Sequence, residues 1–112
     1  MKEAQLCPKF EKAMQMLGKR WTGLIINQLL AGPQRFSQIK AGLPISSKLL
    51  TERLKEMEEE GLATRKVYAE VPVRVEYQLT EKGLALQPIV KEIEKWAHQW
   101  IVIEEDPAAD TD

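Results

Sequence analysis

Short hydroxyl and basic side chains cluster between residues 46 and 55 of this chain. They are Ser46, Ser47, Lys48, Thr51 and Lys55. Such side chains form hydrogen bonds with phosphate oxygens and base edges, so the cluster is typical of a segment that contacts DNA. From Glu56 onward the same stretch becomes acidic, which would repel a polyanion. A segment of this kind would enter a major groove with its N-terminus first. The alternative is an ordinary solvated surface helix.

The sequence predicts one helix over 45–62 to position these side chains. Pro44 disfavours helix before it, Ser46 or Ser47 can cap the N-terminus, and Gly61 can end the helix in a left-handed conformation. Apolar residues recur at helical spacing and should be buried against other elements. They are Leu49, Leu50, Leu54 and Met57.

Cys7 is the single cysteine of the chain, and it precedes Pro8, which is favoured at the first position of a helix. Unpaired backbone N–H groups and the positive dipole end at a helix start favour a thiolate, and Lys9 and Lys12 lie nearby in sequence. A thiolate attacks electrophiles and peroxides faster than a thiol does. Cys7 is therefore a candidate sensor, unless it is only a small apolar residue in a flexible arm.

The net charge of −1 conceals an uneven distribution. Removing the five acids of the tail from Glu104 to Asp112 would leave +4 for the rest of the chain. Between Gln34 and Lys55 five bases stand against one acid, which is a local +4. The negative total therefore does not exclude a nucleic-acid partner. We expect the acidic tail, 104–112, to be disordered.

Three helices should precede and support the two-faced helix. The first begins near Cys7-Pro8 and ends at Gly18, and the second runs from Lys19-Arg20-Trp21 to Gly32-Pro33. A short third helix over 35–40 would form a helix-turn-helix with the helix after it. Helical spacing predicts inward-facing residues in the first two helices. They are Phe10, Ala13, Met14 and Leu17, then Trp21, Leu24, Ile25, Gln28 and Leu29.

After Gly61 the apolar period changes from 3.6 to 2, which predicts a β-hairpin with strands over 63–69 and 73–79. Three bases make this hairpin basic, and a basic hairpin after a recognition helix is a wing. We expect Arg65, Lys66 and Arg74 to contact the DNA backbone or minor groove. Lys55 and Gln38 are predicted to reach phosphates, and Ser46, Ser47, Lys48 and Thr51 to reach base edges. Arg53 could instead turn inward to pair with an acid.

A final helix should begin at the Thr80 cap, with Gly83 and Pro88 able to loosen or kink its first turns, and carry an apolar stripe that one protomer cannot cover. We predict a dimer interface here, with the first helix as its companion. The alternative is that the helix completes its own core. The interface residues would be Leu86, Ile89, Val90, Ile93, Trp96, Ala97 and Trp100.

Several classes of protein are disfavoured by what the sequence lacks. One cysteine and one histidine are too few for a tetrahedral metal site, so we predict neither metal nor cofactor. No catalytic triad, carboxylate pair or phosphate loop can be assembled, so we predict that the chain is not an enzyme. No apolar run approaches the roughly 20 residues that span a bilayer, and no signal peptide is evident, so we expect a cytoplasmic protein without membrane contact.

Several motifs occur together along residues 7–100. They are Cys7-Pro8, Gly18-Lys19-Arg20-Trp21, Gly32-Pro33 with Arg35-Phe36, the helix from Ser46 to Leu54, Glu70-Val71-Pro72, and the run from Tyr77 to Gly83. In this combination the chain resembles the HxlR-type winged helix-turn-helix regulators, a branch of the MarR-like fold. The resemblance implies a mainly α fold with a β-hairpin wing (α+β) over 1–103, dimerised through its N- and C-terminal helices. It also implies a homodimeric repressor that binds double-stranded DNA at a pseudo-palindromic operator.

Within this family, a subset from Bacillus-like bacteria senses quinones, diamide or other thiol-reactive compounds through a cysteine placed like Cys7. The resemblance thus implies that modification of Cys7 releases the operator. With no second cysteine in the chain, the product would be a Cys7 disulfide between two subunits, a mixed disulfide with a small thiol, or an S-adduct. One alternative keeps the DNA-binding dimer but regulates it by a small aromatic ligand near Trp21, Trp96 and Trp100. Another is a protein-interaction module that uses the acidic tail.

Overall fold

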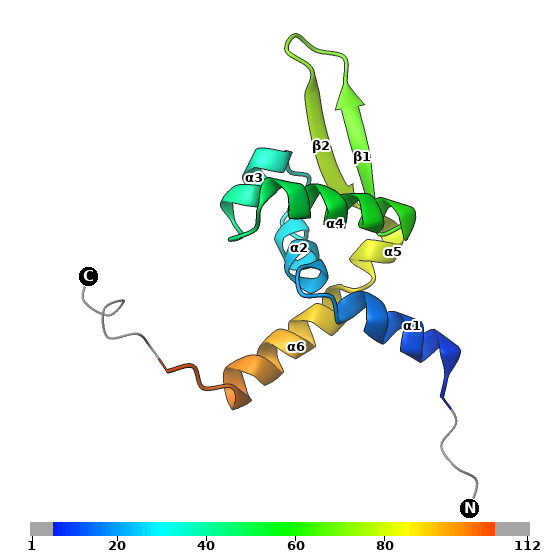
Figure 1. The fold of residues 1–112 in the computed structure, drawn as a ribbon, viewed down its shortest axis with the longest axis vertical. Coiled ribbons are helices and arrows are strands. Elements are labelled where there is room, and N and C mark those ends of the chain that lie inside the picture. Colours follow the sequence, from blue (N-terminus) through cyan, green and yellow to red (C-terminus); the bar gives the residue numbers. More distant parts are fainter. Residues whose placement is uncertain (1–5, 105–112) are drawn as a thin grey trace, which may run out of the picture.

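Helix α2, Thr22–Leu29, lies at the centre of the molecule in this computed structural model, which describes residues 6–104 (Figure 1). Ile25, Ile26 and Leu29 are almost fully buried, because they form one core with side chains of the two helices above them. Trp21 and Leu29 are buried as predicted, whereas Leu24 is 47% exposed. The prediction that Leu24 faces the core was wrong, because Leu24 lines an open pocket together with Leu17, Val90 and Ile93.

Helices α3, Phe36–Ala41, and α4, Ser47–Glu59, form the predicted helix-turn-helix above α2. The apolar face of α4 is buried through Leu50, Leu54 and Met57. The helix is shorter than the predicted span of 45–62, because Ser46 is its N-cap and the chain leaves helical geometry after Glu60. Gly61 has φ +75, the left-handed conformation predicted for it.

Strands β1, Ala63–Tyr68, and β2, Arg74–Leu79, form the predicted antiparallel hairpin, which projects away from the helices (Figure 1). Ala63 lies opposite Leu79, and Tyr68 lies opposite Arg74. Gln34 adds a short bridge on the other edge of β2, where its N–H donates to the Tyr77 carbonyl and its carbonyl accepts from the Tyr77 N–H. This bridge ties the base of the hairpin to the segment that leads into α3.

The final helix is two helices, so the prediction of one continuous helix from Thr80 was wrong. Helix α5, Glu81–Leu84, ends before α6, Gln87–Trp100, begins. Pro88 has no N–H and its ring would clash with the carbonyl of Leu84 in a continuous helix, so it is accommodated in the first turn of α6 instead. Thr80 caps α5 as predicted, accepting a hydrogen bond from the Gly83 N–H at 3.1 Å.

Helices α1, Pro8–Leu17, and α6 diverge on the side of the molecule away from the wing (Figure 1). Neither contains a buried residue. The prediction that Phe10, Ala13 and Met14 face inward was wrong for this protomer, because α1 touches the core only through Met16 and Leu17 near its C-terminal end. Among the described residues, no helix combines the length and apolar character needed to cross a bilayer.

The predicted interface residues of α6 fall into two groups. Leu86 and Val90 pack against the core of their own protomer, and Ala97 is half-buried. The other four, spaced at helical intervals along one face, remain about half exposed or more. We call these the α6 stripe: Ile89, Ile93, Trp96 and Trp100. The acidic tail predicted to be disordered lies outside the described residues from position 105 onward.

Candidate nucleic-acid interface

The N-terminal turns of α4 are open to solvent, and they carry the side chains that the sequence predicted for base contacts. Ser47, Lys48 and Thr51 are exposed, as is Lys55 one turn further along. The helix is held in place from behind by its buried leucines, so its first two turns form a rigid, protruding edge. This arrangement suits entry into a major groove, whose width admits one α-helix.

Two of these hydroxyls already have backbone partners. The Ser46 Oγ accepts from the Leu49 N–H at 3.1 Å, and this N-cap fixes the start of the helix. The Thr51 hydroxyl donates to the Ser47 carbonyl at 2.8 Å, which leaves its lone pairs free to accept. Ser46 can still donate its hydrogen, and Thr51 can accept one. Their predicted contacts with DNA are therefore restricted to those roles.

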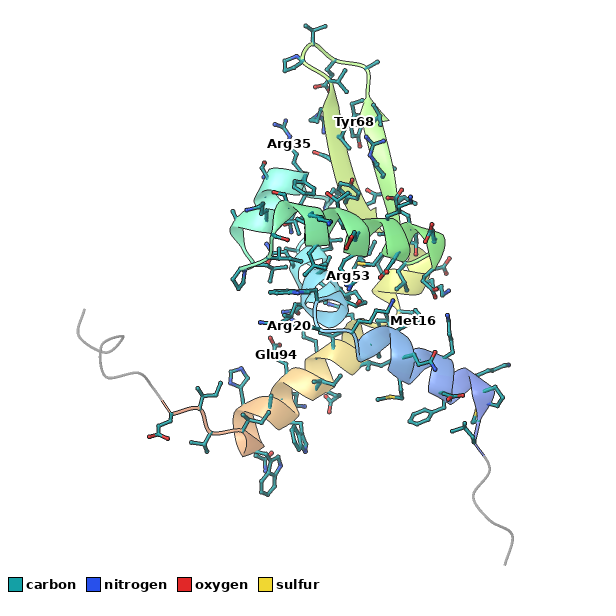
Figure 2. The ribbon with its side chains drawn as sticks, in the orientation of Figure 1. Met16, Arg20, Arg35, Arg53, Tyr68 and Glu94 are labelled. Atoms are coloured by element: carbon teal, nitrogen blue, oxygen red, sulfur yellow. The ribbon has the colours of Figure 1, made fainter. Side chains whose placement is uncertain are left out.

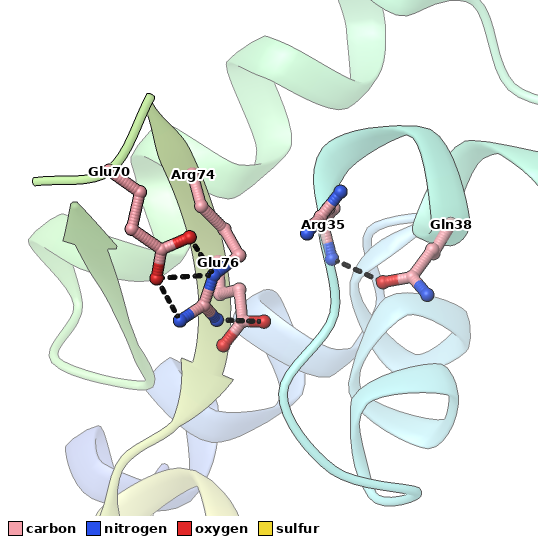
Figure 3. A network of polar contacts seen from close by, with 5 residues as sticks. All are labelled: Arg35, Gln38, Glu70, Arg74 and Glu76. Carbon is pink, nitrogen blue, oxygen red and sulfur yellow. Dashed lines mark hydrogen bonds and ion pairs between the residues drawn. The ribbon is translucent and has the colours of Figure 1, made fainter. Parts of the chain in front are cut away.

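Gln38 and Arg35 lie at the N-terminus of α3. The Arg35 N–H donates to Gln38 Oε1 at 2.8 Å, so the Gln38 amide oxygen caps its own helix (Figure 3). A phosphate contact from Gln38 would have to use its amide nitrogen. Arg35 is exposed beside the hairpin (Figure 2), and its charge was part of the predicted basic stretch, although no role was predicted for it. A role for Arg35 could have been predicted from its position, because it follows Gly32-Pro33 and starts the helix before the recognition helix.

The hairpin register separates the three bases that the sequence grouped on the wing. Directly paired residues share a face of an antiparallel sheet, so Lys66 lies on the face of Glu76, and Arg74 on that of Tyr68. These two pairs are on the same face, because their positions differ by two residues. Arg65 pairs with Tyr77 on the opposite face. Arg65 and Lys66 therefore lie on opposite faces of the wing. A duplex along one face would contact one of them directly, but not both.

Arg74 is bound by two carboxylates of the wing (Figure 3). Its Nη2 donates to Glu70 Oε2 at 2.8 Å and its Nη1 donates to Glu76 Oε2 at 2.7 Å. These hydrogen bonds raise the pKa of Arg74, and the bond donated to Glu70 has the larger effect. The hydrogen bond from Arg74, together with the positive charge of Arg35, lowers the pKa of Glu70. The sequence placed Arg74 on the wing but did not identify these acidic partners.

The C-terminal half of α4 is tied to the turn between α1 and α2 by a three-residue ion cluster. Lys19 Nζ lies 3.2 Å from Glu56 Oε1, and Arg53 Nη1 lies 2.9 Å from the same oxygen. The hydrogen bond from Lys19, followed by the charge of Arg53, lowers the pKa of Glu56. Arg53 (labelled in Figure 2) thus pairs with an acid. This agrees with the alternative prediction that Arg53 turns toward an acid and not toward DNA. The cluster fixes the orientation of α4 relative to α1.

Cys7 is the N-cap residue of α1 and is exposed. Its carbonyl accepts from the Glu11 N–H at 2.9 Å, and Pro8 occupies the first helical position as predicted. The thiol is therefore accessible to reagents from solvent at the start of a helix. It is separated from the recognition helix by the whole length of α1, so any effect on DNA binding would have to act through the position of that helix.

Known proteins similar to this chain are DNA-binding regulators. The HTH-type transcriptional regulator YvaP of Bacillus subtilis is 57% identical over 102 residues, covering 90% of this chain and 94% of YvaP. The reduced form of the regulator YodB of B. subtilis superimposes with a TM-score of 0.79 and 49% identity, covering 90% of this chain and 100% of that one. YodB has also been solved after diamide treatment and with a quinone bound.

A third similar structure is the redox regulator HypR in its oxidized form, with a TM-score of 0.80 and 35% identity. It covers 87% of this chain and 100% of the HypR chain. These relatives confirm the winged helix-turn-helix fold, and they are transcriptional regulators rather than enzymes. The family model described as HxlR-like helix-turn-helix matches residues 16–105. The chain therefore belongs to the HxlR-like helix-turn-helix family of transcriptional regulators.

Proposed function

We propose that this regulator is a homodimeric repressor that binds a pseudo-palindromic operator and releases it when Cys7 is modified. The observation that carries the DNA-binding half is the rigid, exposed N-terminal edge of α4, with Ser47, Lys48 and Thr51. In this proposal α4 reads the major groove, Ser46 assists it as a donor, and Lys55 binds phosphate. Gln38, Arg65, Lys66 and Arg74 contact the DNA backbone, and Arg35 joins them from the start of α3.

Dimerisation follows from the apolar surface that a single protomer leaves uncovered. Trp96 and Trp100 are 58% and 64% exposed on α6, and Phe10 and Met14 are similarly exposed on α1. Burying an aromatic side chain of this kind stabilises an interface by about 1.5–3 kcal/mol. A two-fold axis on this side of the molecule would place two copies of α4 on one face of a duplex, about 34 Å apart.

The exposed thiol of Cys7 carries the sensing half of the proposal, supported by its similarity to a regulator solved with diamide and quinone. Diamide would take two electrons and two protons from two Cys7 thiols, leaving a disulfide between subunits and a hydrazine. This requires the two Cα atoms to lie within about 7 Å. A quinone would form a C–S bond to one Cys7 without that approach. Either product would shift α1, and with it the spacing of the two α4 helices.

DNA binding is tested with fluorescein-labelled duplexes obtained by footprinting, titrated at several salt concentrations. Lys48→Ala should weaken operator binding by about 1–3 kcal/mol, because one base-edge contact is lost. Lys95→Ala is the matched control, since Lys95 is 75% exposed on α6, far from α4 in sequence. Equal operator affinities for both variants would contradict α4 as the DNA-reading helix.

Sensing is tested by repeating the titration after treatment with diamide or a benzoquinone. Wild type should lose at least tenfold in affinity, and Cys7→Ser should lose none. Mass spectrometry and non-reducing gels would then distinguish a covalent dimer from a mixed disulfide or an adduct. If Cys7→Ser loses affinity as wild type does, the signal does not act through the thiol, and a non-covalent aromatic ligand becomes the better explanation.

A further inference from the structure

An apolar groove of about 640 Å³ lies between α1 and the start of α6. Ala13 and Met16 of α1 form one wall, and Leu62 and Leu86 form the other. The protomer covers Leu62 but leaves the groove itself open. The groove is part of neither the DNA-binding edge of α4 nor the α6 stripe.

Three lysines stand around this groove, namely Lys9, Lys12 and Lys82. Lys12 Nζ lies 3.4 Å from Glu60 Oε1, and Lys82 Nζ donates to the Glu60 carbonyl oxygen at 2.6 Å. Of these three lysines, only Lys12 contacts the Glu60 carboxylate, because Lys82 contacts the backbone carbonyl of that residue. The carboxylate therefore offsets one of the three positive charges. A segment that fits this groove should be apolar where it meets the walls and acidic where it meets the rim.

The C-terminal segment of the chain has this character. Ile101 leaves α6 in an extended conformation, and Ile101, Val102 and Ile103 are 52%, 93% and 80% exposed. In the sequence they are followed directly by Glu104, Glu105 and Asp106. Three consecutive exposed aliphatic residues form an apolar surface that a second surface can cover, and the acids after them are opposite in charge to the lysine rim.

The segment cannot reach the groove of its own protomer. The groove lies at Leu86, at the start of α6, and the apolar segment leaves the other end of that helix. The 14 residues of α6 span about 20 Å, whereas three extended residues span only about 10 Å. The two ends of α6 point to different sides of the molecule (Figure 1). The occupant must therefore come from a second copy of the chain.

We propose that residues 101–103 of each protomer dock into the groove between α1 and α6 of a second copy, and that the acids after them pair with Lys9, Lys12 and Lys82. This inference rests on the homodimer of the proposed function. If two α6 stripes pack antiparallel, Ile89 of one copy faces Trp100 of the other. The residues that follow Trp100 then extend past Ile89 toward Leu86 of the second copy, which is a wall of the groove. The exchange is reciprocal, as two-fold symmetry requires.

Disulfide trapping in full-length Cys7→Ser protein tests the docking. The variant that combines Ala13→Cys with Val102→Cys should form a covalent dimer on mild oxidation, at least tenfold faster than either single substitution. Lys95→Cys combined with Ala13→Cys is the matched control, because Lys95 points to solvent away from the α6 stripe. Sedimentation of each reduced variant reports whether the non-covalent dimer is present.

Each outcome decides between the alternatives. A dimer in which Ala13→Cys/Val102→Cys links no faster than the Lys95 control overturns the docking and leaves the proposed homodimer intact. A covalent dimer from Ala13→Cys alone places α1 of the second copy at the groove and also overturns it. A protein that sediments as a monomer overturns both the docking and the homodimer. Glu104→Gln/Glu105→Gln/Asp106→Asn should slow the trapping at 50 mM NaCl but not at 500 mM; equal rates at low salt overturn the charge pairing.

Discussion

The guanidinium carbon of Arg74 lies 3.8 Å from the centroid of the Tyr68 ring, directly across the hairpin. The aromatic face and the carboxylates of Glu70 and Glu76 hold this side chain in one position. A cation that already has two acidic partners offers little net attraction to a phosphate. The wing is therefore less basic at this position than its sequence indicates.

The first prediction concerns the charge of the wing. Glu76→Gln should make Arg74 more available to phosphate, so operator affinity at 50 mM NaCl should rise. The slope of log K against log salt should steepen by up to about 0.9, because one more phosphate is neutralised. Fluorescence anisotropy at several salt concentrations measures both quantities. Glu92→Gln on α6 removes the same charge from a side chain that is 71% exposed, and should change neither. An unchanged slope for Glu76→Gln would exclude Arg74 from the DNA interface.

The second prediction concerns the attachment of α4 to the turn after α1. Lys19 and Arg53 lower the pKa of Glu56, so the folded state holds this carboxylate ionised more strongly than the unfolded state does. The resulting stability is present above the unfolded value of about 4.5 and is lost as pH falls through the lower folded value. The contribution should be less than about 1 kcal/mol, because the Glu56 side chain is 39% exposed and solvent screens its ion pairs.

Urea unfolding of wild type and Glu56→Gln between pH 3 and 7 measures this contribution. Wild type should be the more stable protein at pH 7, and the difference should shrink below about pH 4.5. A difference that is constant across this range would mean that Glu56 acts through packing rather than charge.

The elements of the fold could be predicted from sequence wherever one local signal dominated. The change of period after Gly61 predicted the hairpin, and Pro44, Ser46 and Gly61 predicted α4 to within a few residues. The sequence predicted that Gly83 and Pro88 could loosen or kink the start of the final helix, but not that the helix would end before α6, because the apolar spacing continues through the break.

Side-chain surroundings were harder to predict than the elements. Phe10 and Met14 have core-like spacing on α1 but are exposed, because periodicity identifies an apolar face without identifying what covers it. The Glu70 and Glu76 partners of Arg74 were missed for a related reason. Summing charges along the hairpin does not reveal which charges are paired, and that depends on the turn between the strands.

The third prediction tests whether the α6 stripe contributes to the dimer interface and not to the stability of the protomer. Ile93 is 56% exposed on the α6 stripe, so Ile93→Asp should leave the protomer folded but raise the dimer dissociation constant at least tenfold. Sedimentation measures the dimer and far-UV circular dichroism measures the fold. Lys95→Asp places the same carboxylate two residues away, off the stripe, and should remain dimeric. Equal dissociation constants for the two variants would contradict an interface through this face of α6.

The fourth prediction concerns Gly83, where α5 passes close to Leu62 in the turn between α4 and β1. A Cβ at this position would overlap the carbonyl oxygen of Leu62 and would lie 3.1 Å from Leu79 Cδ2. The same carbonyl accepts a hydrogen bond from the Thr80 N–H at 3.0 Å, so it cannot move away without breaking this bond. Gly83→Ala should therefore destabilise the protein by about 1–3 kcal/mol, the usual cost of overpacking.

Gly23→Ala in α2 is the matched control for this prediction, because a Cβ there would meet no atom within 4 Å. Alanine is the better helix former by up to about 1 kcal/mol, so this variant should be as stable as wild type or more stable. The two substitutions add the same methyl group and should shift the urea midpoint in opposite directions. A Gly83→Ala variant with the midpoint of wild type would show that α5 does not approach Leu62 this closely. The attachment of α6 to the DNA-binding helices through α5 would then need another explanation.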